Sequence, residues 1–127
     1  MSQSTPERRS HPRVDTRVQI QGTPESGAVV ARMETSNLSA GGVQCVSSVD
    51  FPEMTRLGVR LMLPSAEGED GLKPVDVEAV VVRRRELDSH GGRPRFELAL
   101  FFTRVDDESR RFLMRFVERS SNAPVYH

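Results

Sequence analysis

The stretch Asn37-Leu38-Ser39-Ala40-Gly41-Gly42 separates two runs in which apolar or small residues alternate with polar ones. The first run covers residues 29–35, and the second starts at Val43 and Cys45. A period of two residues is typical of a half-buried β-strand. Asn and Ser favour turns, and glycine lets the backbone bend sharply or lie close against a neighbour. We therefore expect a tight turn between two strands.

Four further runs with the same alternation occupy residues 14–20, 57–63, 75–81 and 96–102. Clusters of turn-forming residues separate the runs, at 22–27, 50–53, 65–71 and 89–92. Arg83, Arg84 and Arg85 follow the run at 75–81, and we expect them to close that strand. The alternation as a whole predicts six short strands.

The period becomes helical only after residue 105. An apolar stripe at helical spacing is formed by Phe112, Leu113, Phe116 and Val117. Asp106 or Asp107 stands where a helix N-cap is needed, and an acidic side chain there suits the positive end of the helix dipole. One amphipathic helix is therefore expected to follow the last strand.

Six strands and then one helix predict an all-β fold, a six-stranded antiparallel β-barrel with a C-terminal α-helix. We expect the helix to pack its Phe112 and Phe116 stripe on the wall or the mouth of the barrel. Val80 and Phe101, which are apolar at positions that face away from the core, are a candidate seat for it. Residues 1–12, which are polar and show no periodicity, are expected to form a flexible ligand-binding arm. Residues 13–120 are expected to form a single domain, and residues 121–127 a disordered tail.

Composition narrows the function classes. The 127 residues carry a formal net charge of zero, so no global field favours nucleic acid or a membrane surface. The single cysteine excludes an internal disulfide framework and fits a reducing compartment. No apolar stretch reaches the roughly 20 residues that a membrane span needs. We expect a cytoplasmic protein without a membrane span, and the three histidines show no metal-ligand spacing.

Arginine dominates the basic residues, because Lys73 is the only lysine among 18 basic side chains. Arg8, Arg9 and Arg13 cluster just before the first strand. A guanidinium can hold a phosphate or the edge of a guanine with two hydrogen bonds, or stack on a purine. The cluster therefore suits a flat, anionic, guanine-bearing ligand. The plainer interpretation of the arginine cluster is a solvated basic tail. The plainer interpretation of the Asn37–Gly42 stretch is a structural bend between two strands.

Two motifs give the chain a resemblance to a known family. Arg9-Ser10-His11-Pro12-Arg13 fits the pattern RxxxR, and Asn37-Leu38-Ser39-Ala40-Gly41-Gly42 fits the pattern (D/N)xSxxG. In this order, and with one pair of strands between them, they resemble the motifs of PilZ domains. The resemblance extends from residue 7 to about residue 117 and includes the order of six strands and a helix.

The resemblance implies a function. PilZ domains are bacterial receptors for the second messenger cyclic di-GMP, with no cofactor. By analogy, Arg9 and Arg13 would contact guanines and phosphates, Asn37 and Ser39 would hydrogen-bond a guanine, and Gly41 and Gly42 would shape the turn beneath it. Arg8 stands where an arginine accompanies a stacked pair of ligand molecules. The bound form would present a changed surface to a protein effector that the sequence does not identify.

Three other classes of function remain as alternatives. The first is a PilZ-like adaptor that works through protein contacts without binding nucleotide. The second is an enzyme, which we do not expect because no nucleophile triad or phosphate loop occurs. The third is a binder of single-stranded nucleic acid; we expect no DNA or RNA partner, since aromatic content is low and net charge is zero. Arg83, Arg84 and Arg85 have no assigned role, and one of them could face a ligand or a partner.

Overall fold

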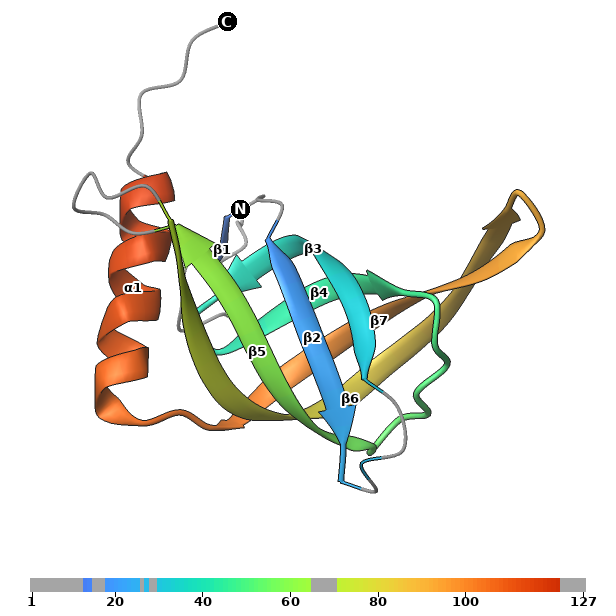
Figure 1. Ribbon diagram of the computed structural model, residues 1–127, viewed down its shortest axis with the longest axis horizontal. Coiled ribbons are helices and arrows are strands. Elements are labelled where there is room, and N and C mark those ends of the chain that lie inside the picture. Colours follow the sequence, from blue (N-terminus) through green and yellow to red (C-terminus); the bar gives the residue numbers. More distant parts are fainter. Residues whose placement is uncertain (1–12, 15–17, 26, 28–29, 65–70, 122–127) are drawn as a thin grey trace, which may run out of the picture.

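A computed structural model describes residues 13–14, 18–25, 27, 30–64 and 71–121. Within these ranges the chain forms seven strands and one helix (Figure 1). In chain order they are β1 (Arg13–Val14), β2 (Gln19–Pro24), β3 (Ala31–Ser39), β4 (Gly42–Ser47), β5 (Arg56–Pro64), β6 (Leu72–His90), β7 (Arg93–Arg104) and α1 (Asp107–Ser121).

The strands β2 to β7 close into a barrel. The sheet order is β1-β3-β2-β5-β6-β7-β4, and an additional pairing of β3 with β4 joins the two ends. Every pairing is antiparallel. The predicted six-stranded antiparallel barrel with a C-terminal helix is therefore confirmed, and β1 is a two-residue addition that pairs with the end of β3.

The barrel interior is an apolar core built by alternation. In β5, for example, Leu57, Val59, Leu61 and Leu63 are buried while the residues between them are more exposed. All four of these side chains are at most 2% exposed. Burying a side chain of this kind stabilises the fold by about 1.5–3 kcal/mol. The hydrophobic pattern of the sequence therefore determines which face of each strand points inward.

The helix begins at a capped end and closes one mouth of the barrel. The Ser109 backbone N–H donates to Asp106 Oδ1 at 2.8 Å, which makes Asp106 the N-cap. The apolar stripe is buried as expected, with Leu113 at 0% and Phe116 at 5% exposure. The helix packs against β1, β3 and β6. Within the described ranges, no helix is both long and apolar enough to cross a membrane.

Of the two expected places for the helix, the mouth is the one it occupies, and the candidate seat over Val80 and Phe101 was wrong. Phe101 is 55% exposed, and Val80 is only partly buried. Only Val105 and Asp106 link β7 to α1, so the helix must begin where β7 ends. It therefore lies across that end of the barrel (Figure 1) and leaves Phe101 exposed and Val80 partly exposed.

The strand β6 is longer than the sequence predicted. Arg83, Arg84 and Arg85 do not close it, because it continues to His90 and pairs with β7 as a hairpin that projects from the barrel (Figure 1). Gly91 and Gly92 form the tip, with φ angles of 64° and 77°. The left-handed region favours glycine and matches the twist of a two-residue hairpin turn. The apolar alternation of β6 stops at the arginines, although the backbone pairing continues and Leu98 and Phe96 opposite them on β7 are still buried.

The strand β2 also continues beyond the predicted boundary. Gly22 to Pro24 were expected to open a turn, but they pair with β5 as part of the barrel wall. A Cβ on Gly22 would lie 2.6 Å from the Met33 Cε, so the absence of a side chain makes room for Met33 in the core. Gly22 therefore allows close packing inside a strand and does not form a turn.

Candidate functional site

The predicted turn between the two motif-flanking strands is present, and Ser39 organises it. β3 ends at Ser39 and β4 begins at Gly42. The Ser39 Oγ accepts hydrogen bonds from the backbone N–H groups of Gly41 and Gly42, both at 3.1 Å. The same hydroxyl lies 3.3 Å from the Gly42 carbonyl, to which it can donate. Ser39 is only 8% exposed, so its side chain holds the loop from within.

Gly42 is required by packing against the neighbouring strand. A Cβ at this position would lie 2.5 Å from the Leu100 carbonyl oxygen on β7. In the described part of the chain, the glycines with positive φ are Gly27, Gly71, Gly91 and Gly92, so unusual backbone angles do not explain Gly42. The absence of a side chain lets β4 approach β7 closely and leaves the outer surface bare at this point.

The N-terminal motif enters the structure beside this turn. Arg13 pairs with Ser39, and Val14 pairs with Leu38. The last residue of the RxxxR motif therefore lies beside β3, the strand that carries the first part of the turn motif. Arg8 and Arg9 lie outside the described residues, as does the whole of the expected arm, residues 1–12. Backbone pairing thus brings Arg13 of one motif beside Ser39 of the other, although these two residues are 26 positions apart in the sequence (39 minus 13).

Thr35 anchors the chain just after the arm, and its role was missed in the sequence. Its Oγ1 accepts a hydrogen bond from the Val18 N–H at 2.8 Å, and its own N–H donates to the Val18 carbonyl at 3.0 Å. Thr35 is 2% exposed, and the sequence pattern placed it correctly on the core face of its strand. The sequence did contain a signal for this role: Thr35 is a polar residue at an inward-facing position, and a buried hydroxyl needs a hydrogen-bond partner. Two links, at Thr35 and at Ser39, therefore tie the N-terminal segment to β3.

Asn37 lies on the part of β3 where the register shifts. It pairs with Gln44 on β4, and the register shift falls between Thr35 and Asn37. Such a bulge inserts a residue into one strand and changes the direction in which the next side chains point. Asn37 is half-buried, while Leu38 and Ser39 are buried. The irregularity thus changes the face on which the side chains of β3 lie from Asn37 onward, two residues before Ser39.

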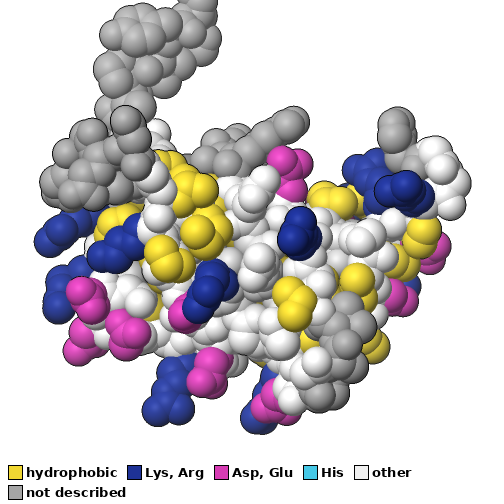
Figure 2. Space-filling model, in the orientation of Figure 1, with side chains coloured by type: hydrophobic (Ala, Val, Ile, Leu, Met, Phe, Trp, Pro, Cys, Tyr) yellow, Lys and Arg dark blue, Asp and Glu magenta, His cyan; other side chains and the backbone are white. Residues whose placement is uncertain are grey.

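Other parts of the surface offer weaker sites. A shallow hollow of about 320 Å³ lies over β2, β5 and β6, where Gly58 leaves space beside the Arg60–Asp76 ion pair. In the ring of six strands, β5 is opposite β4, so this hollow faces away from the Ser39 turn. Figure 2 shows acidic and basic side chains interspersed on the face toward the viewer, with hydrophobic atoms in small groups. Among the residues that the structure describes, no cluster of His, Cys, Asp and Glu could hold a metal ion.

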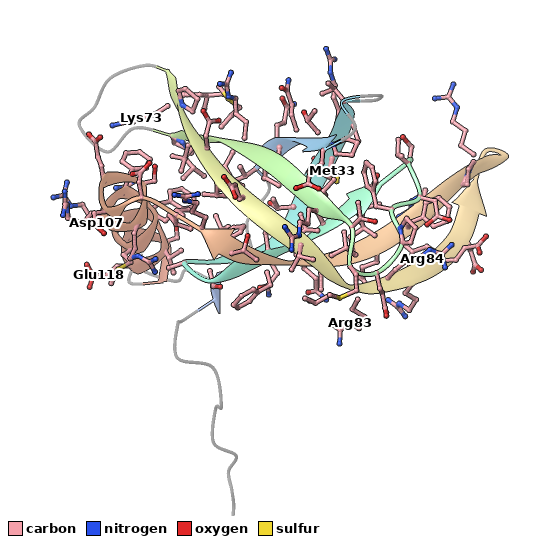
Figure 3. The ribbon with its side chains drawn as sticks, turned by 90° about the horizontal axis from the view of Figure 1, so that it is seen from below. Met33, Lys73, Arg83, Arg84, Asp107 and Glu118 are labelled. Atoms are coloured by element: carbon pink, nitrogen blue, oxygen red, sulfur yellow. The ribbon has the colours of Figure 1, made fainter. Side chains whose placement is uncertain are left out.

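Two of the three hairpin arginines have structural partners. Arg84 forms two hydrogen bonds to Asp50, and its guanidinium lies 5.0 Å from the Phe96 ring centre. This pairing lowers the pKa of Asp50. Arg85 pairs with Glu97 at 2.7 Å. Arg83 is exposed and points away from the sheet, whereas Arg84 lies along the hairpin (Figure 3).

Cys45 is an inert core residue. It is fully buried, and its Sγ lies 3.7 Å from the Met33 Sδ. Burial raises the pKa of the thiol to about 12, so the reactive thiolate is not populated near neutral pH. Nucleophilic chemistry at this cysteine is therefore disfavoured.

Comparisons with known proteins agree with this geometry. A family model described as the PilZ domain matches residues 7–119, and a search of curated proteins gives no match. The structure of the inhibitor of motility MotI/DgrA from Bacillus subtilis is similar, with a TM-score of 0.72, 23% identity and 91% of this chain covered. This chain spans about half of that protein, because the match covers 51% of it.

Two other solved structures show the same fold. The PilZ domain of YcgR from Escherichia coli, solved with c-di-GMP, has a TM-score of 0.63, 17% identity and coverage of 91% of this chain and 92% of that domain. MrkH from K. pneumonia has a TM-score of 0.70, 14% identity and coverage of 94% of this chain and 51% of that protein. The barrel with its helix, the motif turn and the family match over residues 7–119 lead to one conclusion: this chain belongs to the PilZ domain family.

Proposed function

We propose that this protein is a receptor for cyclic di-GMP and that the ligand binds between the N-terminal arginines and the Ser39–Gly42 turn. The observation that carries the proposal is the pairing of Arg13 with Ser39. It brings the end of the arginine motif to the turn motif, as one shared site requires. The YcgR domain, whose structure contains c-di-GMP, has a similar fold and supports the same ligand.

The chemistry of the arm suits this ligand. Cyclic di-GMP carries two phosphate charges and two guanines, and Arg8, Arg9 and Arg13 supply three guanidiniums. Charge-assisted hydrogen bonds from guanidinium to phosphate are among the strongest in proteins. Asn37, half-buried on β3, would offer its amide to a guanine edge. Ser39 would act by holding the Gly41 and Gly42 amides in place, as its hydroxyl does in the turn. Arg8 would favour a stacked pair of ligand molecules over a single one.

The proposed output is a changed surface rather than a reaction. The strand β1, which carries Arg13, packs against α1 as well as β3. An arm that closes over a ligand would therefore alter the surface formed by β1 and the neighbouring end of α1. We propose that a protein effector reads this surface, as in switches that order a segment on ligand binding. Catalysis has no role in this proposal.

The second candidate is an adaptor that acts without nucleotide. The observation in its favour is that the Ser39 hydroxyl is used within its own turn, so the turn motif has a structural reason to exist without a ligand. The receptor is preferred because the three arginines of the cluster suit a ligand with two phosphate charges and two guanines.

The two candidates differ in a calorimetric titration with cyclic di-GMP. The receptor should bind in the micromolar range or tighter, and salt should weaken binding because phosphates are contacted. Arg9→Ala and Arg13→Ala should each lose about 1.5–3 kcal/mol, the usual contribution of a hydrogen bond to a charged group. Arg115→Ala, on the exposed side of α1, is the matched control and should bind like the wild type. Equal affinities for all four proteins would reject the site, and no binding by the wild type would favour the adaptor.

A further inference from the structure

Phe101 is an exposed aromatic side chain on the outer wall of the barrel. It is 55% exposed, although its neighbours Leu100 and Phe102 are only 3% and 6% exposed. Its partner on β4 is Gly42, and its partner on β6 is Val80. Since Gly42 has no side chain, the ring is uncovered on the side that faces the motif turn.

The turn motif and Phe101 form one continuous surface. The Phe102 N–H donates to the Gly41 carbonyl at 3.0 Å, and the Cβ position of Gly42 lies 3.7 Å from the Phe101 Cα. On the same outer face, Asn37 pairs with Gln44, and Gln44 pairs with Ala99. Two strand spacings, about 10 Å, separate Asn37 from β7. Gly42 and Ala99 add little or no side chain to this surface, and a flat ligand that reaches from Asn37 to Phe101 would pass over the side chain of Gln44.

A bulge extends this surface on β6. The register shifts between Val81 and Arg83, so Val82 is an extra residue on the outer side. Val82 is 50% exposed, and Arg83 pairs with Ala99. Within the described ranges, no carboxylate forms an ion pair with Arg83. The far rim thus carries an apolar side chain and a cation beside the Phe101 ring.

We propose that Phe101 is a stacking platform for a guanine of the bound cyclic dinucleotide, which extends the binding site from the β3–β4 turn onto β7. This inference rests on the proposed function. A purine is a flat aromatic surface, and stacking on an exposed aromatic side chain is a common way for proteins to hold a base. The platform would bind the part of the ligand that lies farthest from Asn37, with Arg83 available at the rim.

The first test is the affinity for cyclic di-GMP measured by calorimetry. Phe101→Ala should weaken binding about tenfold or more, the usual effect of removing a stacked aromatic residue. Phe101→Tyr keeps the ring and should stay within about threefold of the wild type. Leu72→Ala is the matched control, because Leu72 is an exposed apolar residue, at 56%, near the other end of β6. Binding of Phe101→Ala within twofold of the wild type would overturn the platform and leave the receptor proposal intact.

The second test does not depend on the alanine variant. The chain contains no tryptophan and one tyrosine, so Phe101→Trp creates a single indole that can be excited selectively at the red edge of the absorption band. Cyclic di-GMP should quench its emission, because guanine stacked on an indole quenches by electron transfer, whereas Leu72→Trp should be unaffected. Binding without quenching at residue 101 would overturn the platform alone. Absence of binding by the wild type would defeat the receptor proposal and the platform together.

Discussion

At the scale of single residues, the motif around Ser39 works largely through the backbone. The Ser39 hydroxyl fixes two amide groups, and Gly42 lets two strands come together. The spacing of the motif predicted a turn at these residues. The contact that makes Gly42 necessary, the Leu100 carbonyl, comes from a strand more than 50 positions away and was invisible in the sequence.

Gly42→Ala should destabilise the barrel. The added Cβ would meet the Leu100 carbonyl at 2.5 Å, and backbone atoms cannot move aside easily. Overpacking of this kind costs about 1–3 kcal/mol of unfolding free energy, measurable by urea denaturation. Gly58→Ala is the control, since its Cβ would meet the Thr23 carbonyl at an ordinary 3.8 Å. Equal stabilities for the two variants would contradict this account of Gly42.

At the scale of elements, strands that face the core were predictable and strands that leave it were not. Alternation identified β5 from Leu57 to Leu63 because every second side chain enters the barrel. The outer part of β6 lost that signal at Arg83, because its own side chains there are charged and mostly exposed, although Leu98 and Phe96 opposite them on β7 stay buried. The candidate seat of the helix over Phe101 was wrong for a different reason. An outward-facing apolar residue can serve either to pack a helix or to bind a partner, and sequence periodicity does not distinguish the two.

The N-cap of α1 should make stability depend on acidic pH. The hydrogen bond from the Ser109 N–H lowers the pKa of Asp106 below its ordinary value of 3.8. The folded state therefore binds the proton less readily than the unfolded state. The stabilisation is complete above pH 3.8 and is lost as the pH falls through the folded-state pKa.

Two variants separate the cap from its charge. Asp106→Asn keeps a good capping side chain and removes the titration, whereas Asp106→Ala removes both. Thermal melts should show that the stability difference between wild type and Asp106→Asn shrinks from pH 6 to pH 2.5. The Asp106→Ala variant should melt below Asp106→Asn at both pH values. A difference between wild type and Asp106→Asn that does not change with pH would argue against the cap as the titrating group.

The hairpin of β6 and β7 should depend on Arg84 more than on Arg83. Arg84 holds Asp50 through two hydrogen bonds and packs on Phe96, while Arg83 points into solvent. Arg84→Ala should speed amide hydrogen exchange in residues 84–97, and Arg83→Ala should leave it near the wild-type rate. Equal protection in both variants would mean that backbone pairing alone holds the hairpin.

At the scale of the whole molecule, the barrel positions three parts of the proposed mechanism around one region. The motif turn lies between β3 and β4, Arg13 pairs with β3, and α1 packs against β1 and β3. The resemblance of the two motifs to those of PilZ domains predicted that they would share a site. It did not predict that β7 borders this site, because that neighbour follows from closure of the barrel.

The most direct measurement of the central claim is a titration of the ¹⁵N-labelled protein with cyclic di-GMP, followed by amide chemical shifts. Binding between the arginine arm and the turn predicts the largest changes at Ser39, Gly41 and Gly42, with small changes at Gly58 and Asp76 on the opposite wall. The largest changes at Gly58 and Asp76, with Gly41 and Gly42 unaffected, would contradict it.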